Sequence, residues 1–484
     1  MSKLFIFGIG GTGARVLRAF THLCAAGVKL HDTSTVIPII IDPDSDNNDL
    51  DRTVKLINNY RRINKQTGGG AQREGLFSTH FQSLGEYHNI KNSDEKISDD
   101  ILLSFDILSS ETFQDTLAIP FIDSRLTRDL LELIYTQEGL QKPLTHGYLG
   151  HPNIGSMLLH KMKESKEFNY FASNFVTGDR IFIISSIFGG TGAAGFPVLV
   201  KILRDRKSTL PSAAAMNSAA VGAVSIQPYF NVQADTSSNI DSSNFVTKTK
   251  AALAYYARNL GEVNSLYYLG DKAVPALYNN SDGGKTQRNN ANLIELIAAL
   301  SIFHFQSEGN HGGNSFNEYE LKEETLEYNF KNLNSNIDDE LSRRMTILYY
   351  LRYFLNRDHS VFANNSWYKV HDMRNRLFNS RQYAPLDEVL TDYEEWLGEL
   401  ENNRRVFKPF LLRDGAGNPE EMYDLVTGFE KPKKFMNNFK VDDLSRAMNK
   451  NFNIGENAEA LAPFLAAFDK SAEDCISKFN IFNK

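Results

Sequence analysis

The sequence predicts an α/β fold in which a largely parallel sheet is followed by a mostly helical C-terminal region. Three observations predict it. Apolar strands alternate with helices through residues 1–305, as in sheets that are covered on both faces. Two glycine-rich turns, at 8–13 and 189–195, each follow an apolar strand and lead into an apolar helix. Strand signals become rare in residues 306–484, so we expect two parts that meet near residue 305.

Each expected element rests on a local pattern of apolar residues. The expected strands are 3–7, 36–41, 180–188, 219–227 and 265–269. The expected helices of the first part are 14–26, 196–205, 245–259 and a long core helix at about 290–305. Residues 47–146 are weakly patterned, with a helical segment at about 128–137, and we interpret them as an insertion. Helical patterns of the second part lie near 320–333, 337–356, 385–404 and 456–479.

Composition narrows the class of protein. Hydrophobic residues make up 42% and charged residues 23% of the 484 residues, as in folded soluble proteins. The formal net charge of -7 gives no electrostatic reason to expect nucleic acid or an anionic membrane as a partner. Only Cys24 and Cys475 are present, which fits a reducing compartment, and we expect the cytoplasm. No apolar stretch has the length of a membrane span, so no membrane segment is expected.

The two glycine-rich turns are candidate phosphate-binding loops. Glycine lets a backbone approach phosphate oxygens closely, and a helix N-terminus presents unpaired N–H groups. The candidate residues of the first turn are Gly8, Gly10, Gly11, Thr12 and Gly13, and those of the second are Gly189, Gly190, Thr191 and Gly192. Two such turns in one chain favour a nucleotide that is held from both ends. The alternative for the second turn is a bend of small residues that packs a helix.

Asp42 and Asp44 follow the second apolar strand, at the end of a strand where open α/β sheets bind their ligands. Two carboxylates suit a hard cation that is shared with phosphate oxygens, so both are candidate Mg²⁺ ligands. They are also ordinary turn formers and helix caps. The first turn alone fits a dinucleotide fingerprint as well, with Asp42 as the ribose-binding acid, which would indicate an NAD(P)-dependent oxidoreductase. The second turn shifts the preference away from that interpretation.

The order of these motifs resembles that of the tubulin and FtsZ superfamily of GTPases. The similarity covers roughly residues 1–305 and rests on the two glycine turns, the acidic pair, the loop 150–155 and the apolar strand at 221–226 with the Gln-Pro-Tyr-Phe turn that follows it. Within the superfamily the second part looks closest to divergent bacterial tubulin-like proteins. The resemblance implies a Rossmann-type GTPase domain that binds GTP or GDP with Mg²⁺.

The resemblance also implies roles for single residues. Gly150, Asn153 and Gly155 stand in a loop similar to one that lies near the terminal phosphate. Asn292, at the start of the long helix, is similar to the asparagine that contacts guanine, and an amide suits a purine edge because it both donates and accepts. Asn292 is equally suited to cap its helix, as are Asn289 and Asn290.

The chain departs from the family pattern after the long helix. In FtsZ-like filaments an acidic loop there reaches the nucleotide of the next subunit and drives hydrolysis. Here the catalytic residues are unknown, and the nearest acidic candidates are Glu318 and Glu320. The sequence therefore leaves two functions open: a Mg²⁺-dependent GTPase that self-assembles into a homo-oligomer or filament, and a non-hydrolysing switch whose helical C-terminal half docks a protein partner.

Overall fold

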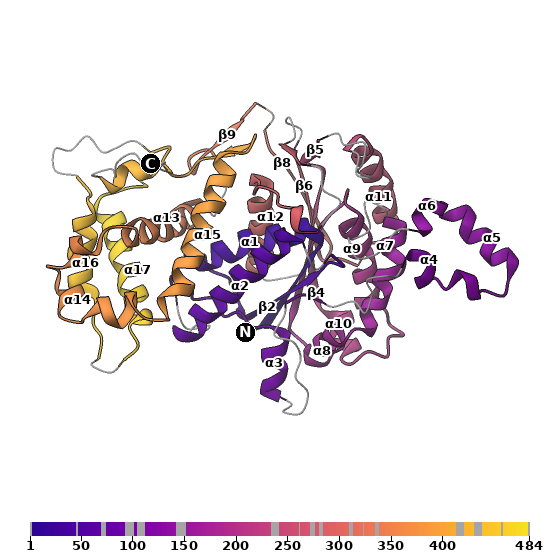
Figure 1. The fold of residues 1–484 in the computed structure, drawn as a ribbon, viewed down its shortest axis with the longest axis horizontal. Coiled ribbons are helices and arrows are strands. Elements are labelled where there is room, and N and C mark those ends of the chain that lie inside the picture. The colour runs from indigo at the N-terminus through magenta and orange to yellow at the C-terminus, as the bar shows by residue number, and fades with distance from the viewer. Residues whose placement is uncertain are drawn as a thin grey trace.

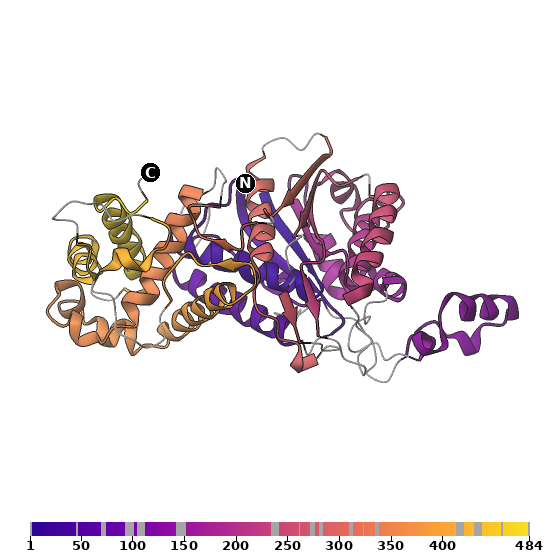
Figure 2. The same ribbon diagram turned by 90° about the horizontal axis from the view of Figure 1, so that it is seen from above.

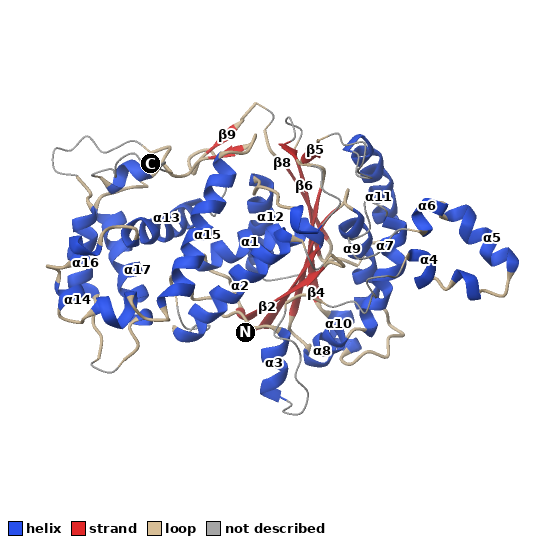
Figure 3. Cartoon of the chain, viewed as in Figure 1, coloured by secondary structure: helices blue, strands red, loops and turns tan. Residues whose placement is uncertain are grey.

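A central sheet of six parallel strands organises the molecule (Figure 1; Figure 3). The computed structural model describes residues 2–482 apart from fifteen gaps, namely 45–46, 69–73, 92–100, 104–111, 142–151, 234–241, 261, 272–275, 280–283, 309–312, 323, 334–337, 413–420, 430–437 and 456–457. The strand order is β2-β1-β3-β4-β6-β8. Their bounds are β1 Ser2–Ile9, β2 Thr33–Ile41, β3 Arg180–Ser186, β4 Ala220–Ile226, β6 Ser265–Gly270 and β8 Ser315–Glu320.

Both faces of the sheet are buried, because alternate side chains of the strands enter two separate hydrophobic clusters. In β1, Leu4 and Ile6 join one cluster, whereas Phe5 and Phe7 join the other. This is the two-faced burial expected of a parallel sheet that helices cover on both sides.

Helices from different parts of the chain cover the two faces (Figure 1). One face carries α1 Gly10–Ala26, α2 Asn48–Gln66 and α12 Leu293–Ser307. The other carries α7 Pro152–Leu159, α8 Lys166–Asn174, α9 Gly190–Leu203, α10 Ala213–Ser218 and α11 Phe245–Asn259. Two short parallel pairs lie outside the main sheet, β5 Phe230–Val232 with β7 Ala276–Tyr278 and β9 Glu327–Tyr328 with β10 Val406–Phe407.

The direction of the connections reverses between β1 and β3. The chain leaves β1 through α1 and returns on one side in β2, whereas it leaves β3 through α9 and returns on the other side in β4. Since β1 and β3 are neighbours, with Gly8 opposite Ile184, the two exits diverge from one point of the sheet edge. A crevice at such a switch point, outside the carboxyl ends of the strands, is where open α/β sheets bind ligands.

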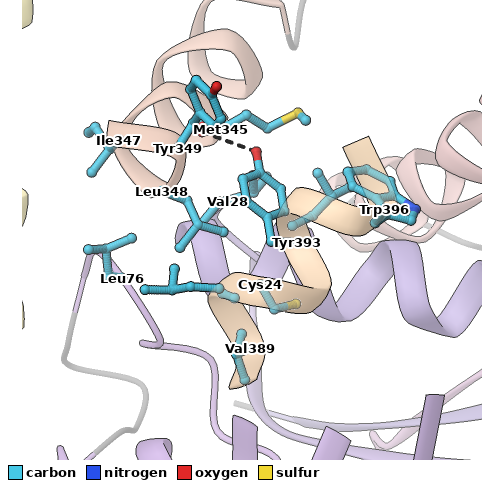
Figure 4. Close-up of a cluster of buried hydrophobic side chains, with 14 of the residues drawn as sticks. Cys24, Val28, Leu76, Met345, Ile347, Leu348, Tyr349, Val389, Tyr393 and Trp396 are labelled. Carbon is cyan, nitrogen blue, oxygen red and sulfur yellow. Dashed lines mark hydrogen bonds between the residues drawn. The ribbon is translucent and has the colours of Figure 1, made fainter. Parts of the chain in front are cut away.

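The C-terminal helices pack on the α1 side of the molecule. They are α13 Asp338–Leu355, α14 Ser366–Lys369, α15 Tyr383–Glu401, α16 Val441–Asn451 and α17 Leu461–Lys478. Figure 4 shows Cys24 and Val28 of α1 and its C-terminal end beside Leu348 and Tyr393. The Tyr393 hydroxyl donates a hydrogen bond to the Met345 carbonyl at 3.1 Å. One hydrophobic cluster runs from β1 into these helices.

Four further α-helices of the described chain precede β3. Helix α3 Leu84–Lys91 lies below the sheet in Figure 1, and α4 Phe113–Thr116, α5 Arg125–Ile134 and α6 Gln137–Leu140 form an arm that stands off the body (Figure 2). In the described part of the chain, no helix is long and apolar enough to cross a membrane.

The predicted fold class is confirmed: the molecule is α/β, with a parallel sheet and a mostly helical C-terminal region. Strand β8 follows residue 305 and still pairs with β6, so the sheet draws on both predicted parts. The helix predicted near 320–333 is wrong. Its apolar residues Tyr328 and Phe330 are buried at a spacing of two, and β9 pairs there with β10, so strand pairing overrides a helix-forming composition.

Candidate functional site

The two glycine-rich turns lie close together at the switch point. Gly10 has a φ of +73°, and a Cβ built on it lies 3.5 Å from the Thr191 Cβ and 3.7 Å from the Gly192 backbone nitrogen. Gly11, Gly189 and Thr191 are partly exposed, whereas the other residues of the two turns are buried. The turns therefore lie side by side at the sheet edge where open α/β sheets bind their ligands. We call this place the crevice, the two turns its walls and the three partly exposed residues its mouth.

Two glycines in the walls are required by close packing. A Cβ on Gly13 would lie 2.5 Å from the Gly8 carbonyl carbon, and one on Gly192 would lie 2.6 Å from the Ser186 oxygen. Both contacts are with backbone, which has no room to move aside. These glycines let α1 and α9 start directly against the strands that precede them.

The N-termini of α1 and α9 carry no side-chain cap. Ile9 and Gly189 occupy the N-cap positions without a capping hydrogen bond, and neither helix has an acidic residue in its first turn. Helices α2 and α12 differ, because Asn47 and Asn292 cap them and acidic residues follow. The first-turn N–H groups of α1 and α9, and the positive ends of both helix dipoles, therefore face the crevice without a side-chain cap.

Nitrogen donors surround Gly11. A Cβ on Gly11 would lie 3.4 Å from the Gln287 Nε2, 3.6 Å from an Arg15 guanidinium nitrogen and 3.7 Å from the Asn47 Nδ2. The Asn47 oxygen accepts from the Asp49 N–H at 2.9 Å, which fixes its amide nitrogen toward Gly11. Two side-chain amide nitrogens, and one guanidinium nitrogen that is paired with Asp49, therefore lie beside the first turn.

Behind the first turn lies a buried charged cluster that sequence reasoning missed. The Arg15 guanidinium donates to Glu295 at 2.6 Å, to Asp49 at 2.9 Å and to the Tyr229 hydroxyl at 2.8 Å. It also lies 3.3 Å from the Thr12 hydroxyl. Burial opposes the charge of Arg15, but Tyr229 and the two carboxylates outweigh it and raise its pKa well above the usual value. The available signal was charged residues in two otherwise largely apolar helices, Arg15 and Arg18 in α1 and Glu295 in α12.

This cluster continues into the C-terminal helices. Arg52 bridges Asp49 at 2.8 Å and Glu399 of α15 at 2.6 Å, and Glu399 also pairs with Arg18 of α1 at 2.7 Å. The same carboxylate accepts from the Ala291 N–H just before α12 at 2.9 Å. A continuous chain of charges thus joins the first turn to the helical C-terminal half.

Asp42 and Asp44 lie beside the first turn. Ile41 pairs with Ile9, so Asp42 follows β2 at the level where Gly10 follows β1. The Asp42 carboxylate accepts from the Asp44 N–H at 3.1 Å, the geometry of an Asx turn, and Asp44 accepts from the Gly284 N–H at 2.7 Å. Burial, together with the charge of Asp44, raises the pKa of Asp42 to about 7.

The acidic pair fits a divalent cation in its donor chemistry. Asp42 and Asp44 are 6% and 3% exposed, and two buried carboxylates this close together favour a positive ion between them. Among the described residues, no group of three or more His, Cys, Asp or Glu side chains forms a metal cluster, so a cation here would take its remaining ligands from phosphate or water.

Asn292 is the N-cap of α12. Its side-chain oxygen accepts from the Ile294 N–H at 3.0 Å, and the Glu295 carboxylate accepts from the Asn292 N–H at 3.0 Å, which completes a capping box. The Asn292 amide nitrogen lies 3.5 Å from the Asn403 Oδ1, and the side chain is buried. Asn292 therefore makes the hydrogen bond of a helix cap, and its recognition of a base stays a prediction.

The other predicted residues lie as follows. Gly150 is outside the described residues, and so is the side chain of Asn153, whose backbone belongs to α7. Gly155 is buried in α7. Glu318 and Glu320 are exposed on β8, four strands from β1, which corresponds to about 19 Å across the sheet. They do not touch the glycine turns of their own molecule.

No protein-family model matches the sequence, and neither does any curated protein. Among solved structures, CetZ from Methanosaeta thermophila strain DSM 6194 is 13% identical, with a TM-score of 0.23 over 56% of this chain and 46% of that chain. CetZ2 from Haloferax volcanii, in a GTPγS-bound protofilament, is also 13% identical, with a TM-score of 0.29 over 64% of this chain and 60% of that chain. Both neighbours are tubulin/FtsZ-like proteins. The chain spans about half to three fifths of their length.

Proposed function

We propose that the chain is a tubulin/FtsZ-like protein that binds a guanine nucleotide, with the phosphates held in the crevice between the two glycine turns. The observation that carries the proposal is that Gly10 lies close to Thr191 and Gly192, because this brings two helix N-termini without side-chain caps together at the switch point of the sheet. Backbone amides of both turns would bind phosphate oxygens, and the donors around Gly11 would add to them.

In this proposal Asp42 and Asp44 hold Mg²⁺ beside the phosphates, and the ion neutralises their charge. Asp42 then serves as an anionic ligand even though burial favours its protonated form in the free protein. Asn292 lies at the start of α12, whose Glu295 contacts Arg15, so the base would lie at this end of the crevice.

The identity of the ligand tests the proposal directly. Mass spectrometry of the nucleotide released from the denatured protein should find GDP or GTP, whereas NAD(P) would support the oxidoreductase alternative. Replacing Thr191 by Tyr at the mouth of the crevice should abolish binding of a fluorescent GTP analogue. Thr209→Tyr, in an exposed loop, is the matched control and should bind normally. Equal affinity of the two variants would rule out the crevice.

A role of Asn292 in base recognition can be tested separately from its role as the N-cap of α12. Asn292→Ala should cost about 1 kcal/mol of stability, because the cap is lost, whereas Asn292→Ser keeps a capping oxygen. If the amide reads guanine, both variants should lose about 1–3 kcal/mol of preference for GTP over ATP in competition binding. A variant pair that differs in stability but keeps the preference would assign Asn292 to capping alone.

The second candidate function is a non-hydrolysing switch, and the charged chain from Thr12 to Glu399 favours it because that chain connects the crevice with the C-terminal helices. GTP turnover at increasing protein concentration separates the two functions. A rate per subunit that rises with concentration indicates self-assembly with a catalytic group from a neighbour, such as Glu318 or Glu320. Tight binding without turnover at any concentration indicates the switch.

A further inference from the structure

A cavity lies between α12 and the outer strands β6 and β8 of the sheet, which stand near one another in Figure 1. Its volume is about 290 Å³, and residues 319–322, 328 and 332–333 also line it. None of the described residues that line it belongs to a glycine turn, so the cavity is separate from the crevice. The proposed function gives it no role.

One face of α12 forms a wall of the cavity. Ile294, Ile297, Ser301 and His304 line it, and their spacing of three or four residues places them along one side of the helix. Ile297 and Leu300 also line the cavity and remain partly exposed, although they pack against the hydrophobic core. The helix therefore presents aliphatic side chains to a hollow that another apolar molecule can fill.

The cavity also has a buried hydroxyl group without a partner. Tyr328 lines the cavity and is 5% exposed, and its hydroxyl oxygen is buried with no hydrogen-bond partner among the described residues. Other polar groups of the wall are paired: the Tyr267 hydroxyl lies 2.7 Å from the His304 Nδ1, and the Ser301 hydroxyl donates to the Ala298 carbonyl at 2.6 Å. A buried hydroxyl that lacks a partner is unfavourable, so a bound molecule that pairs with Tyr328 gains affinity.

Charge and size select the class of ligand. Glu320 and Lys322 are exposed and of opposite sign, and the other described lining residues include no Asp, Glu, Lys or Arg. The cavity therefore favours a neutral ligand, because a charged one would lose its hydration without gaining a counter-charge. The volume is at the lower end of the roughly 300–1,000 Å³ of small-molecule sites, which suits a compound of about one or two rings.

We propose that this cavity binds a small, neutral and largely apolar compound whose single hydroxyl or carbonyl group hydrogen-bonds to Tyr328. The apolar part of the compound packs against Ile297 and Leu300 of α12. The site is separate from the nucleotide crevice and does not rest on the proposed function.

Three related probes test the proposal in equilibrium dialysis with the full chain: 2-naphthol, naphthalene and 2-naphthoate. The wild type should bind 2-naphthol, with naphthalene about fivefold to tenfold weaker because it leaves the Tyr328 hydroxyl unpaired. The carboxylate should bind at least tenfold more weakly than 2-naphthol, because the cavity supplies no net positive charge. No saturable binding of 2-naphthol, or a preference for the carboxylate, would overturn the proposal.

Tyr328→Phe separates ligand binding from a structural role. The variant should lose the fivefold to tenfold advantage of 2-naphthol over naphthalene and bind naphthalene as the wild type does. Its melting temperature should not fall, because the substitution removes a hydroxyl that has no partner in the free protein. An unchanged advantage of 2-naphthol, or equal losses for both probes, would show that Tyr328 does not contact the ligand, and the proposal would fail.

A blocking variant locates the bound probe. Ile297→Trp should fill the cavity and abolish 2-naphthol binding, and its melting temperature reports whether it folds. Leu126→Trp is the matched control, because Leu126 lies on α5 with 82% of its surface exposed and should bind 2-naphthol normally. Wild-type affinity in a folded Ile297→Trp variant would place the probe elsewhere and contradict the proposal. If Ile297→Trp does not fold, the Tyr328→Phe comparison decides.

Discussion

Gly11 and Gly13 stand two residues apart, but the surroundings of their backbones differ. At Gly13 an added Cβ meets the Gly8 backbone at 2.5 Å, whereas at Gly11 the nearest atom is a flexible Gln287 side-chain nitrogen at 3.4 Å. Gly13→Ala should therefore lower the free energy of unfolding by about 1–3 kcal/mol, and Gly11→Ala should change it by less than about 0.5 kcal/mol. Urea denaturation of both variants measures the difference, and equal losses would contradict the observed packing.

Asp42 makes stability depend on pH. Its pKa is about 7 in the folded protein and near 3.8 in the unfolded chain, so the folded state binds the proton more tightly. Proton binding by Asp42 therefore stabilises the folded state. This stabilisation is complete below about pH 4 and is lost as the pH rises to about 7. Asp42→Asn keeps an acceptor for the Asp44 N–H and does not titrate. The variant should thus be about 1–3 kcal/mol more stable than the wild type at pH 8, with a smaller gap at pH 5.

Denaturation at both pH values without added nucleotide or Mg²⁺ checks this expectation. A gap that stays constant between pH 5 and pH 8 would show that Asp42 has an ordinary pKa. The same variant should bind GTP more weakly in the presence of Mg²⁺ if the carboxylate is a ligand, so a stabilising substitution would lower function.

At the level of single residues, the sequence located the glycine turns and the acidic pair because local spacing alone encodes them. The partners of Arg15 were out of reach, since Glu295 lies 280 positions away and only the fold brings the two together. For the same reason no local pattern distinguished the capping role of Asn292 from a base contact.

At the level of elements, Glu399 of α15 joins three helices. Its carboxylate pairs with Arg18 and Arg52 and accepts from the Ala291 N–H. Glu399→Gln removes one of the two carboxylates that each buried guanidinium contacts, because Arg18 keeps Asp392 and Arg52 keeps Asp49, so we expect a loss of about 1–3 kcal/mol in the free energy of unfolding. Glu395 lies on the same helix in an exposed pair, 3.7 Å from Arg288, and Glu395→Gln should cost less than about 1 kcal/mol. Similar losses in both variants would show that the buried network does not hold the helices together.

Apolar periodicity located most of the elements. The five expected strands each match an observed one, and the helix expected at 245–259 has those same bounds. Strand β8 was missed because an edge strand with exposed Phe316, Glu318 and Glu320 lacks the buried run that marks a central strand. Helix α5 was expected within a few residues of its place, but only the structure shows that its apolar face is uncovered.

At the level of the whole molecule, the shared core predicts unfolding in one step. The only tryptophans, Trp367 and Trp396, lie in the C-terminal helical region, and Trp396 packs 5.1 Å from the His22 ring of α1. Tryptophan fluorescence and far-ultraviolet circular dichroism should therefore give the same urea midpoint. If the proposed nucleotide binds, a concentration of 100 Kd should raise the stability reported by tryptophan by about 2.7 kcal/mol. Separate midpoints would show that the two parts unfold independently.

The crevice has a further consequence for the order of events during synthesis. Its walls are about 180 residues apart in the chain, so at 5–20 residues per second the ribosome releases the second wall roughly 10–40 s after the first. During that interval the nascent β1 and α1 can associate with β2, but the second turn does not yet exist, so no ligand can bind between the two turns. Any bound phosphate compound would therefore enter only after β1, α1, β2 and β3 have been made, and it would take no part in starting the fold.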